Sequence, residues 1–262
     1  MGRIDSAPQP TAVEFPLPWG PVVRGVQWGW GSDVALFLHE PGADLDAWGP
    51  LPSRLAEALG LTSVALDLPG HGLSDDPWEL HRAGELVRFL VETVTATSDP
   101  DASTEGGGKA SGTDRSPGRR FVIAADSIAS ETLTQAGRLR LAGLVAVSPI
   151  DPASAASEPR EAMPSTPTAL GGRSRKERDA TPKLLIAGSL SGSDLATARR
   201  IASTSAGWTA VTSIPATERG TALLATPWKT RISEGITGFL RECLHPRPGG
   251  HPVSRVRPRL PD

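Results

Sequence analysis

The stretch VALFLHEPGADLDAWGPLPSRLAEALGLTSVALDLPGHGLSD, residues 34–75, decides the fold class. It contains two short apolar runs, 34–40 and 62–69, separated by a segment, 47–60, whose apolar residues recur at helical spacing. Neither run alternates apolar with polar residues, and this pattern is typical of strands that are buried on both faces of a parallel sheet. The order strand, helix, strand therefore predicts a βαβ unit.

The rest of the chain repeats this alternation. Further apolar runs rich in Val, Ile and Leu predict strands at 120–126, 141–149, 183–189 and 209–215. Amphipathic segments between and after them predict helices at 77–94, 130–139, 193–204 and 231–243. The segment 13–30 favours an antiparallel hairpin at one edge. We therefore predict the α/β class: a doubly wound, mostly parallel sheet flanked by helices, forming a single domain over residues 15–243.

Length and composition exclude several classes of protein. A chain of 262 residues can bury one full α/β core. Its formal net charge of -2 gives no basic field, so we expect neither nucleic acid nor a membrane as a partner. The single cysteine, Cys243, excludes an intramolecular disulfide and favours a reducing cytoplasm. No apolar stretch approaches the roughly 20 residues that span a bilayer.

No cofactor and no metal are predicted. The sequence has no phosphate-binding glycine loop, no nucleotide fingerprint and no cluster of Cys and His at metal-ligand spacing. Two polar segments, 97–120 and 151–182, predict flexible loops, because they contain too few large apolar side chains to offset the entropy cost of ordering. Residues 1–14 are predicted to be flexible. The basic, proline-rich segment 244–262 predicts a disordered tail, with a weak electrostatic contact for a partner as the alternative.

In an open parallel sheet, ligands bind beyond the carboxyl ends of the strands, so the loops after each run should carry the chemistry. The stretch 34–75 resembles the α/β-hydrolase superfamily. It is similar to that family's His-Gly-x-Gly oxyanion loop, the Trp that follows it, and the Asp-x-x-Gly-His-Gly-x-Ser turn. The resemblance covers residues 15–243. It implies a protein without a cap and with an open pocket, because the composition of 151–182, where capped relatives insert a helical lid, cannot form one.

The resemblance implies that Ser127 occupies the nucleophile position. The family's Gly-x-Ser-x-Gly elbow reads ADSIA over residues 125–129, so each glycine is replaced by alanine, which adds one methyl group. We expect Ser127 at the tip of a sharp turn between a strand and a helix. The alternative is that Ser127 is an ordinary helix N-cap.

The same resemblance implies that the other two members of the catalytic triad are substituted. Arg219 stands at the position of the histidine base, and a guanidinium cannot accept a proton at physiological pH. Ser191 stands at the position of the acid. Asp151, in the loop after the preceding strand, is the alternative acid, whereas Asp194 is expected to cap the helix 193–204. His71 is expected to make structural hydrogen bonds.

The oxyanion loop also departs from the family pattern. If its register holds, Pro41 stands where the family donates a backbone N–H, and proline has none. The Ile128 N–H would then be the main-chain donor that is left. We expect His39, Glu40 and Asp126 to line the pocket, with His39 in a structural hydrogen-bonding role.

These departures favour a protein that has lost ordinary serine-hydrolase activity and binds a small ligand or a protein partner. The alternative is a divergent hydrolase that cleaves an ester or an amide with Ser127 as its nucleophile. A third hypothesis is an interaction subunit that uses a surface around Trp28, Trp30 and Trp48. Against it, core packing is expected for Trp48, because the family has a buried aromatic residue there.

Overall fold

The described residues form one eight-stranded sheet. The computed structural model describes residues 9–76, 82–97, 118–151 and 179–246. The strands are β1 (Thr11–Pro16), β2 (Val22–Trp28), β3 (Val34–Leu38), β4 (Thr62–Leu66), β5 (Arg120–Ala125), β6 (Gly143–Val147), β7 (Lys183–Gly188) and β8 (Thr209–Ile214). The helices are η1 (Leu45–Trp48), α1 (Leu51–Leu59), α2 (Ala83–Thr97), α3 (Asp126–Leu139), α5 (Gly192–Thr204), η4 (Gly220–Ala225) and α6 (Lys229–Leu244).

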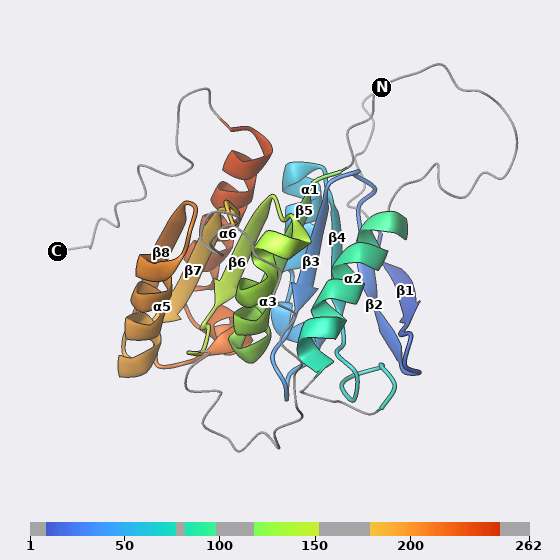
Figure 1. Ribbon diagram of the computed structural model, residues 1–262, viewed down its shortest axis with the longest axis horizontal. Coiled ribbons are helices and arrows are strands. Elements are labelled where there is room, and N and C mark those ends of the chain that lie inside the picture. The colour runs from blue at the N-terminus through green and yellow to red at the C-terminus, as the bar shows by residue number, and fades with distance from the viewer. Residues whose placement is uncertain (1–8, 77–81, 98–117, 152–178, 247–262) are drawn as a thin grey trace, which may run out of the picture.

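The strand order is β1-β2-β4-β3-β5-β6-β7-β8, and all pairs from β4 to β8 are parallel. The β1–β2 hairpin joins the sheet antiparallel at the β4 side, which confirms the predicted edge hairpin. Figure 1 shows these strands side by side with the helices packed against them. All six parallel strands lie within the apolar runs from which the sequence predicted them.

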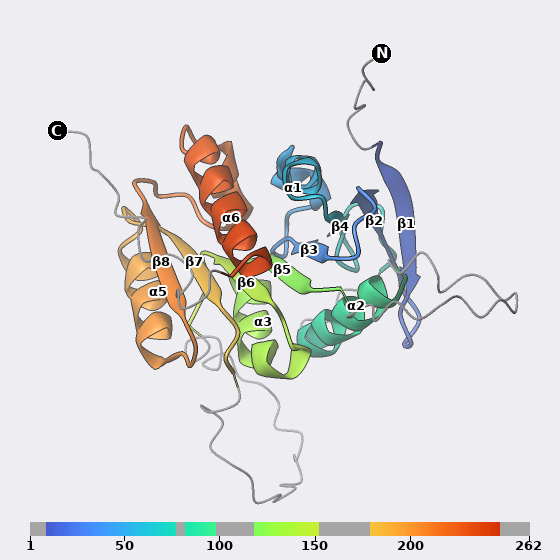
Figure 2. The ribbon, with the colours of Figure 1, turned by 90° about the horizontal axis from the view of Figure 1, so that it is seen from above.

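Both faces of the central strands of the sheet are buried. In β3, Val34, Leu36 and Leu38 belong to the apolar cluster on one face. Ala35 and Phe37 belong to the cluster on the other face. Figure 2 shows α1 and α6 on one side of the sheet and α2, α3 and α5 on the other. The continuous apolar runs follow from this arrangement, because each successive side chain meets a helix layer.

Some predicted boundaries differ from the structure. β1 begins at Thr11, inside the segment predicted to be flexible, because its backbone pairs with β2 along its whole length. Most of the predicted loops 97–120 and 151–182, including the place where a lid would be inserted, lie outside the described residues, as does the tail from residue 247. Within the part of the chain that the structure describes, no helix is both long and apolar enough to cross a bilayer.

Candidate functional site

The residue at the turn between β5 and α3 is Asp126. Its φ of 49° lies in the left-handed region, and it directly follows Ala125, the last residue of β5. Ser127 is the second residue of α3, and the N-cap position of that helix is held by Ala125. The expectation that Ser127 lies at the tip of the turn was therefore wrong, and so was its alternative role as N-cap. Aspartate tolerates a left-handed backbone better than most residues, because its short side chain can hydrogen-bond locally.

Arg219 reaches this turn from the loop after β8. Its guanidinium donates to Oδ2 of Asp126 at 3.2 Å and to Oδ1 of Asp194. Asp194 is the third residue of α5, whose N-cap position is held by Ser191 without a side-chain capping bond. The expectation that Asp194 caps this helix was therefore wrong: its carboxylate is directed at Arg219. We call Asp126, Arg219 and Asp194 the ion-pair cluster.

Burial differs sharply among the three members of the ion-pair cluster. The side chain of Asp194 is 1% exposed, whereas those of Asp126 and Arg219 are 26% and 38% exposed. One guanidinium thus neutralises a fully buried carboxylate and a partly exposed one. The Oδ2 atom of Asp194 is buried and has no hydrogen-bond partner among the described residues. The buried carboxylate therefore depends on Arg219 for its charge compensation.

Glu40, just after β3, binds the segment after β8 that carries Arg219. Its Oε1 accepts hydrogen bonds from the backbone N–H of Thr221 at 3.0 Å and from the hydroxyl of Thr221 at 2.8 Å. Gly220, at a φ of 55°, leaves room for this contact, since a Cβ atom there would lie 2.5 Å from Oε1 of Glu40. Pro41 follows Glu40 in an exposed turn, and Ile128 is buried in the first turn of α3. Glu40 therefore fastens the end of β3 to the segment that carries Arg219.

His39 and His71 are structural, as the sequence predicted. The Nε2 atom of His39 accepts from the N–H of Leu68 at 3.0 Å, so the Nδ1–H donates to the carbonyl oxygen of Glu40 at 2.8 Å. His71 accepts from the N–H of Gly42 at 2.9 Å in the same way. Burial lowers the pKa of His39, which is fully buried and held as the neutral imidazole. Neither ring is available as a base for a group at the turn after β5.

Asp67, the first residue of the Asp-x-x-Gly-His-Gly-x-Ser turn, holds that turn together by hydrogen bonds. Its carboxylate is buried and accepts from the N–H of Leu45 at 2.8 Å and from the N–H of Leu73 at 2.9 Å. The Ser74 hydroxyl donates back to the Asp67 carbonyl at 2.7 Å. The most family-like motif of the sequence thus ties the loop after β3 to the loop after β4, and it is a structural element.

Asp151 and the tryptophans were also named as candidate residues. Asp151 forms an ion pair with Arg200 of α5. Trp48 is 1% exposed and packs edge-on against Phe37, so its predicted burial is confirmed. Trp30 is 74% exposed. Among the described residues, no group of three or more His, Cys, Asp or Glu side chains is arranged to hold a metal ion.

Comparison by sequence gives a short match. No protein-family model matches the chain. A stretch of 92 residues is 39% identical to the dihydrolipoyllysine-residue acetyltransferase component of the acetoin cleaving system of Cupriavidus necator. The match covers 34% of this chain and 24% of that relative, so the chain spans about a quarter of the relative's length.

Comparison by structure covers nearly the whole chain. Est1E from Butyrivibrio proteoclasticus, solved with ferulic acid, superposes with a TM-score of 0.65 at 12% identity, over 88% of this chain and 99% of that one. A predicted CIB-like hydrolase from Thermoplasma acidophilum gives 0.63 at 14% identity, over 90% and 99%. XC6422 from Xanthomonas campestris, an α/β serine hydrolase without lid, gives 0.56 at 13% identity, over 92% and 97%. This chain has the α/β-hydrolase fold.

The α/β-hydrolase fold explains what sequence reasoning missed at the site. In this fold the nucleophile sits on the sharp turn between a strand and the helix that follows it. The Gly-x-Ser-x-Gly motif, when its serine is matched to Ser127, predicts the turn at Ser127, one residue after the left-handed residue Asp126. The available signal was the end of the apolar run 120–126, because Asp126 is the first polar residue after the buried part of that strand. Asp194 was assigned to a helix cap, and its contact with Arg219 was not predicted, because its local sequence resembles an ordinary helix start.

Proposed function

We propose that this protein has lost ordinary serine-hydrolase activity and acts by binding a small ligand or a protein partner. The observation that carries the proposal is the guanidinium of Arg219, which contacts both Asp126 and Asp194. Serine-hydrolase chemistry needs a base between the nucleophile and the acid that takes up a proton and then returns it. A guanidinium stays protonated at physiological pH, so Arg219 cannot fill that role.

On this proposal, the three positions of the triad are held by Asp126, Arg219 and Asp194. The nucleophile position is then Asp126, and the residue after it, whose N–H would serve the oxyanion, is Ser127 in place of Ile128. The second donor would come from the loop after β3, where Pro41 has no N–H. Loss of one oxyanion donor costs a factor of roughly 10²–10³ in rate, and loss of a triad member costs much more.

The alternative is a divergent ester or amide hydrolase with Ser127 as its nucleophile. Ser127 is half-buried in the first turn of α3, next to the ion-pair cluster. Within the described residues its hydroxyl makes no hydrogen bond to a histidine, and both His39 and His71 already use their ring nitrogens elsewhere. An unactivated serine hydroxyl is a weak nucleophile, which favours the binding role.

A fluorophosphonate probe read by intact mass separates the two hypotheses. We expect no adduct on the folded wild-type protein or on Arg219→His, which supplies an imidazole but leaves an aspartate at the turn. The double variant Asp126→Ser with Arg219→His places serine, histidine and Asp194 at the three positions, and we expect it to be labelled. Labelling of the wild type that is lost in Ser127→Ala would overturn the proposal. Labelling of Arg219→His alone would place the nucleophile at Ser127.

A further inference from the structure

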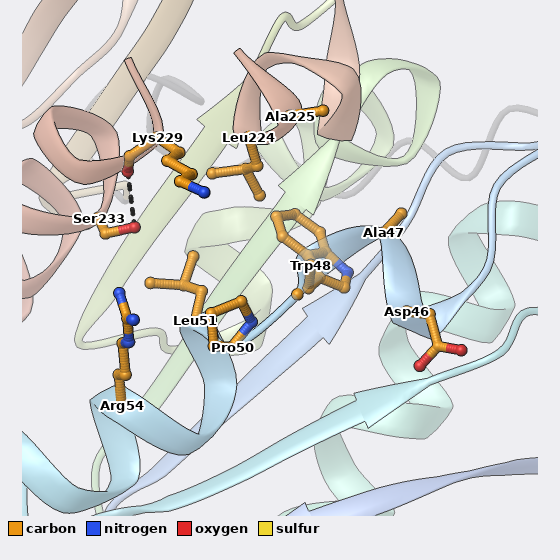
Figure 3. A pocket seen from close by; sticks show the side chains of 11 residues that line it. Asp46, Ala47, Trp48, Pro50, Leu51, Arg54, Leu224, Ala225, Lys229 and Ser233 are labelled. Atoms are coloured by element: carbon orange, nitrogen blue, oxygen red, sulfur yellow. Dashed lines mark hydrogen bonds between the residues drawn. The ribbon is translucent and has the colours of Figure 1, made fainter. Parts of the chain in front are cut away.

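Two features of the described protein lie outside the ion-pair cluster. One is a hollow between the starts of α1 and α6, shown in Figure 3. Its inner wall offers a ligand almost no surface, because Trp48 and Leu51 are 1% and 2% exposed. The other is the outer edge of β8, the last strand at one end of the sheet (Figure 1), where the first four residues are half-buried and Ser213 is exposed. The edge of β8, unlike the inner wall of the hollow, is therefore accessible to a partner.

Three residues of β8 present unpaired backbone groups at this edge. In a parallel pair, alternate residues of a strand bond to the neighbouring strand. The carbonyl oxygens of Trp208 and Ile214 accept from backbone N–H groups on the β7 side, at 2.9 and 2.7 Å. These two bonds fix the alternation, so Thr209, Val211 and Ser213 direct their N–H and C=O groups away from β7. No described residue pairs with these three N–H and three C=O groups.

The two ends of the sheet differ in how they resist pairing with another chain. β1, at the other end, carries Glu14, whose exposed carboxylate pairs with Arg24, and it ends in Pro16, which has no N–H. A charged side chain and a proline are common devices that keep an edge strand from pairing. β8, with the sequence TAVTSI, has no charged residue and no proline. The end of the sheet at β8 is therefore the one that is open to strand pairing.

We propose that the edge of β8 pairs antiparallel with β8 of a second copy of this chain, about a two-fold axis at Val211. In this register Val211 faces Val211 of the second copy, and Thr209 faces Ser213. Each facing pair exchanges two backbone hydrogen bonds, so the three pairs satisfy all the outward N–H and C=O groups of both strands. Because β8 carries no charged side chain, no like charges face each other across the two strands.

The side chains of β8 fit the same register. Val211 packs at the margin of an apolar cluster and is half-buried, so pairing brings the two Val211 side chains together and buries them further. The hydroxyl of Thr209 has no hydrogen-bond partner among the described residues, and the Ser213 hydroxyl of the second copy would lie opposite it. Pairing of β8 with β1 is disfavoured by Glu14 and Pro16, so the assembly closes as a dimer instead of growing into a fibre.

Sedimentation velocity of the full-length protein tests the proposal. Pairing of six-residue strands gives an interface below the standard size, roughly 1,200–2,000 Å², so we expect a reversible dimer. Its fraction should rise with protein concentration between about 1 and 200 µM. A monomer throughout this range would mean that the edge stays free or is covered by another segment of the same chain, and it would overturn the proposal.

A matched pair of variants tests which edge is used. Ser213→Lys adds a charge at an exposed residue of β8 and should weaken the dimer about tenfold or more. The control is Thr11→Lys, which adds the same charge at an exposed residue of β1 and should leave the dimer unchanged. Circular dichroism checks that both variants fold. A dimer that survives Ser213→Lys, or one that Thr11→Lys weakens equally, would overturn the assigned edge.

Cysteine cross-linking with copper phenanthroline as the oxidant tests the register. Val211→Cys places two thiols at the axis with Cα atoms about 5.5 Å apart, inside the disulfide range of about 4.4–6.8 Å, so a disulfide dimer should form. Thr209→Cys should not cross-link by itself, because the two copies of residue 209 lie about 13 Å apart along the strands, but it should cross-link when mixed with Ser213→Cys. The wild type, whose single cysteine is the partly buried Cys243, gives the background. Equal cross-linking of Thr209→Cys and Val211→Cys would overturn the proposed pairing.

Discussion

Replacing Arg219 with methionine tests whether the ion-pair cluster supports the fold. The substitution removes the positive charge and keeps most of the length of the side chain. Removing one partner of a fully buried ion pair costs about 3–5 kcal/mol, because the other charge stays buried and uncompensated, whereas an exposed pair contributes about 0.2–1 kcal/mol. Asp194 is 1% exposed but Arg219 is 38% exposed, so the pair lies between these limits.

We therefore expect Arg219→Met to lower the free energy of unfolding by about 2–3 kcal/mol. For a chain of this size, each kcal/mol corresponds to about 2–4 °C in the midpoint of thermal unfolding, so the midpoint should fall by about 5–10 °C. The measurement is urea unfolding followed by circular dichroism and tryptophan fluorescence, with thermal unfolding as a second readout. The matched control is Arg200→Met, which breaks the more exposed pair with Asp151 and should cost no more than about 1 kcal/mol.

A double-mutant cycle of Arg219→Met with Asp194→Asn tests whether Asp194 is the partner that makes the loss of Arg219 costly. If the buried carboxylate is what makes the loss of Arg219 costly, the double variant should be less destabilised than the sum of the two single variants, by about 1–2 kcal/mol. The reasoning would be refuted if Arg219→Met stayed within about 0.5 kcal/mol of the wild type, or if the two substitutions were additive.

Three further predictions follow from other buried or capping groups. Burial lowers the pKa of His39 below its ordinary value of 6.5, so the stability that the neutral ring contributes is complete above pH 6.5 and is lost as the pH falls below it. In that range His39→Gln should therefore flatten the slope of the urea midpoint plotted against pH, and an unchanged slope would contradict this. Burial raises the pKa of the Cys243 thiol to about 12, so iodoacetamide at pH 8 should leave Cys243 unmodified in the folded protein and alkylate it in urea. Rapid alkylation without urea would show that the thiol is not buried in this way. The Arg119 guanidinium donates to the carbonyl oxygens of Cys243 and Leu244 at the end of α6, so Arg119→Met should cost about 1 kcal/mol and speed amide exchange in the last turn; unchanged exchange there would exclude this capping role.

The predicted strands were reliable because their signal is local. A strand with a helix layer on each face needs an apolar residue at every position, and β3 and β5 meet this condition along nearly their whole length. The edge hairpin was predicted from the segment 13–30, but the start of β1 at Thr11 was not. An edge strand with one covered face carries a weaker pattern, and its beginning depends on the partner strand that pairs with it.

The candidate site could be predicted only in part. The resemblance of the loops after β3 and β8 to family motifs predicts that Arg219 stands at the position of the base and Pro41 at that of an oxyanion donor, and both assignments stay predictions. It placed the turn after β5 one residue away from Asp126, because a motif written around serine carries no information on which residue adopts a left-handed backbone.

Only the tertiary structure decided what Arg219 contacts. Asp194 is 25 residues from Arg219 along the chain and Asp126 is 93 residues from it. The three residues meet because β5, β7 and β8 are parallel, so the loops that follow them all begin at the carboxyl end of the sheet. Composition and periodicity determine that such strands form. Which of several acidic side chains then lies within reach of one guanidinium depends on the register of the strands and the length of each loop, and these are fixed only when the sheet is assembled.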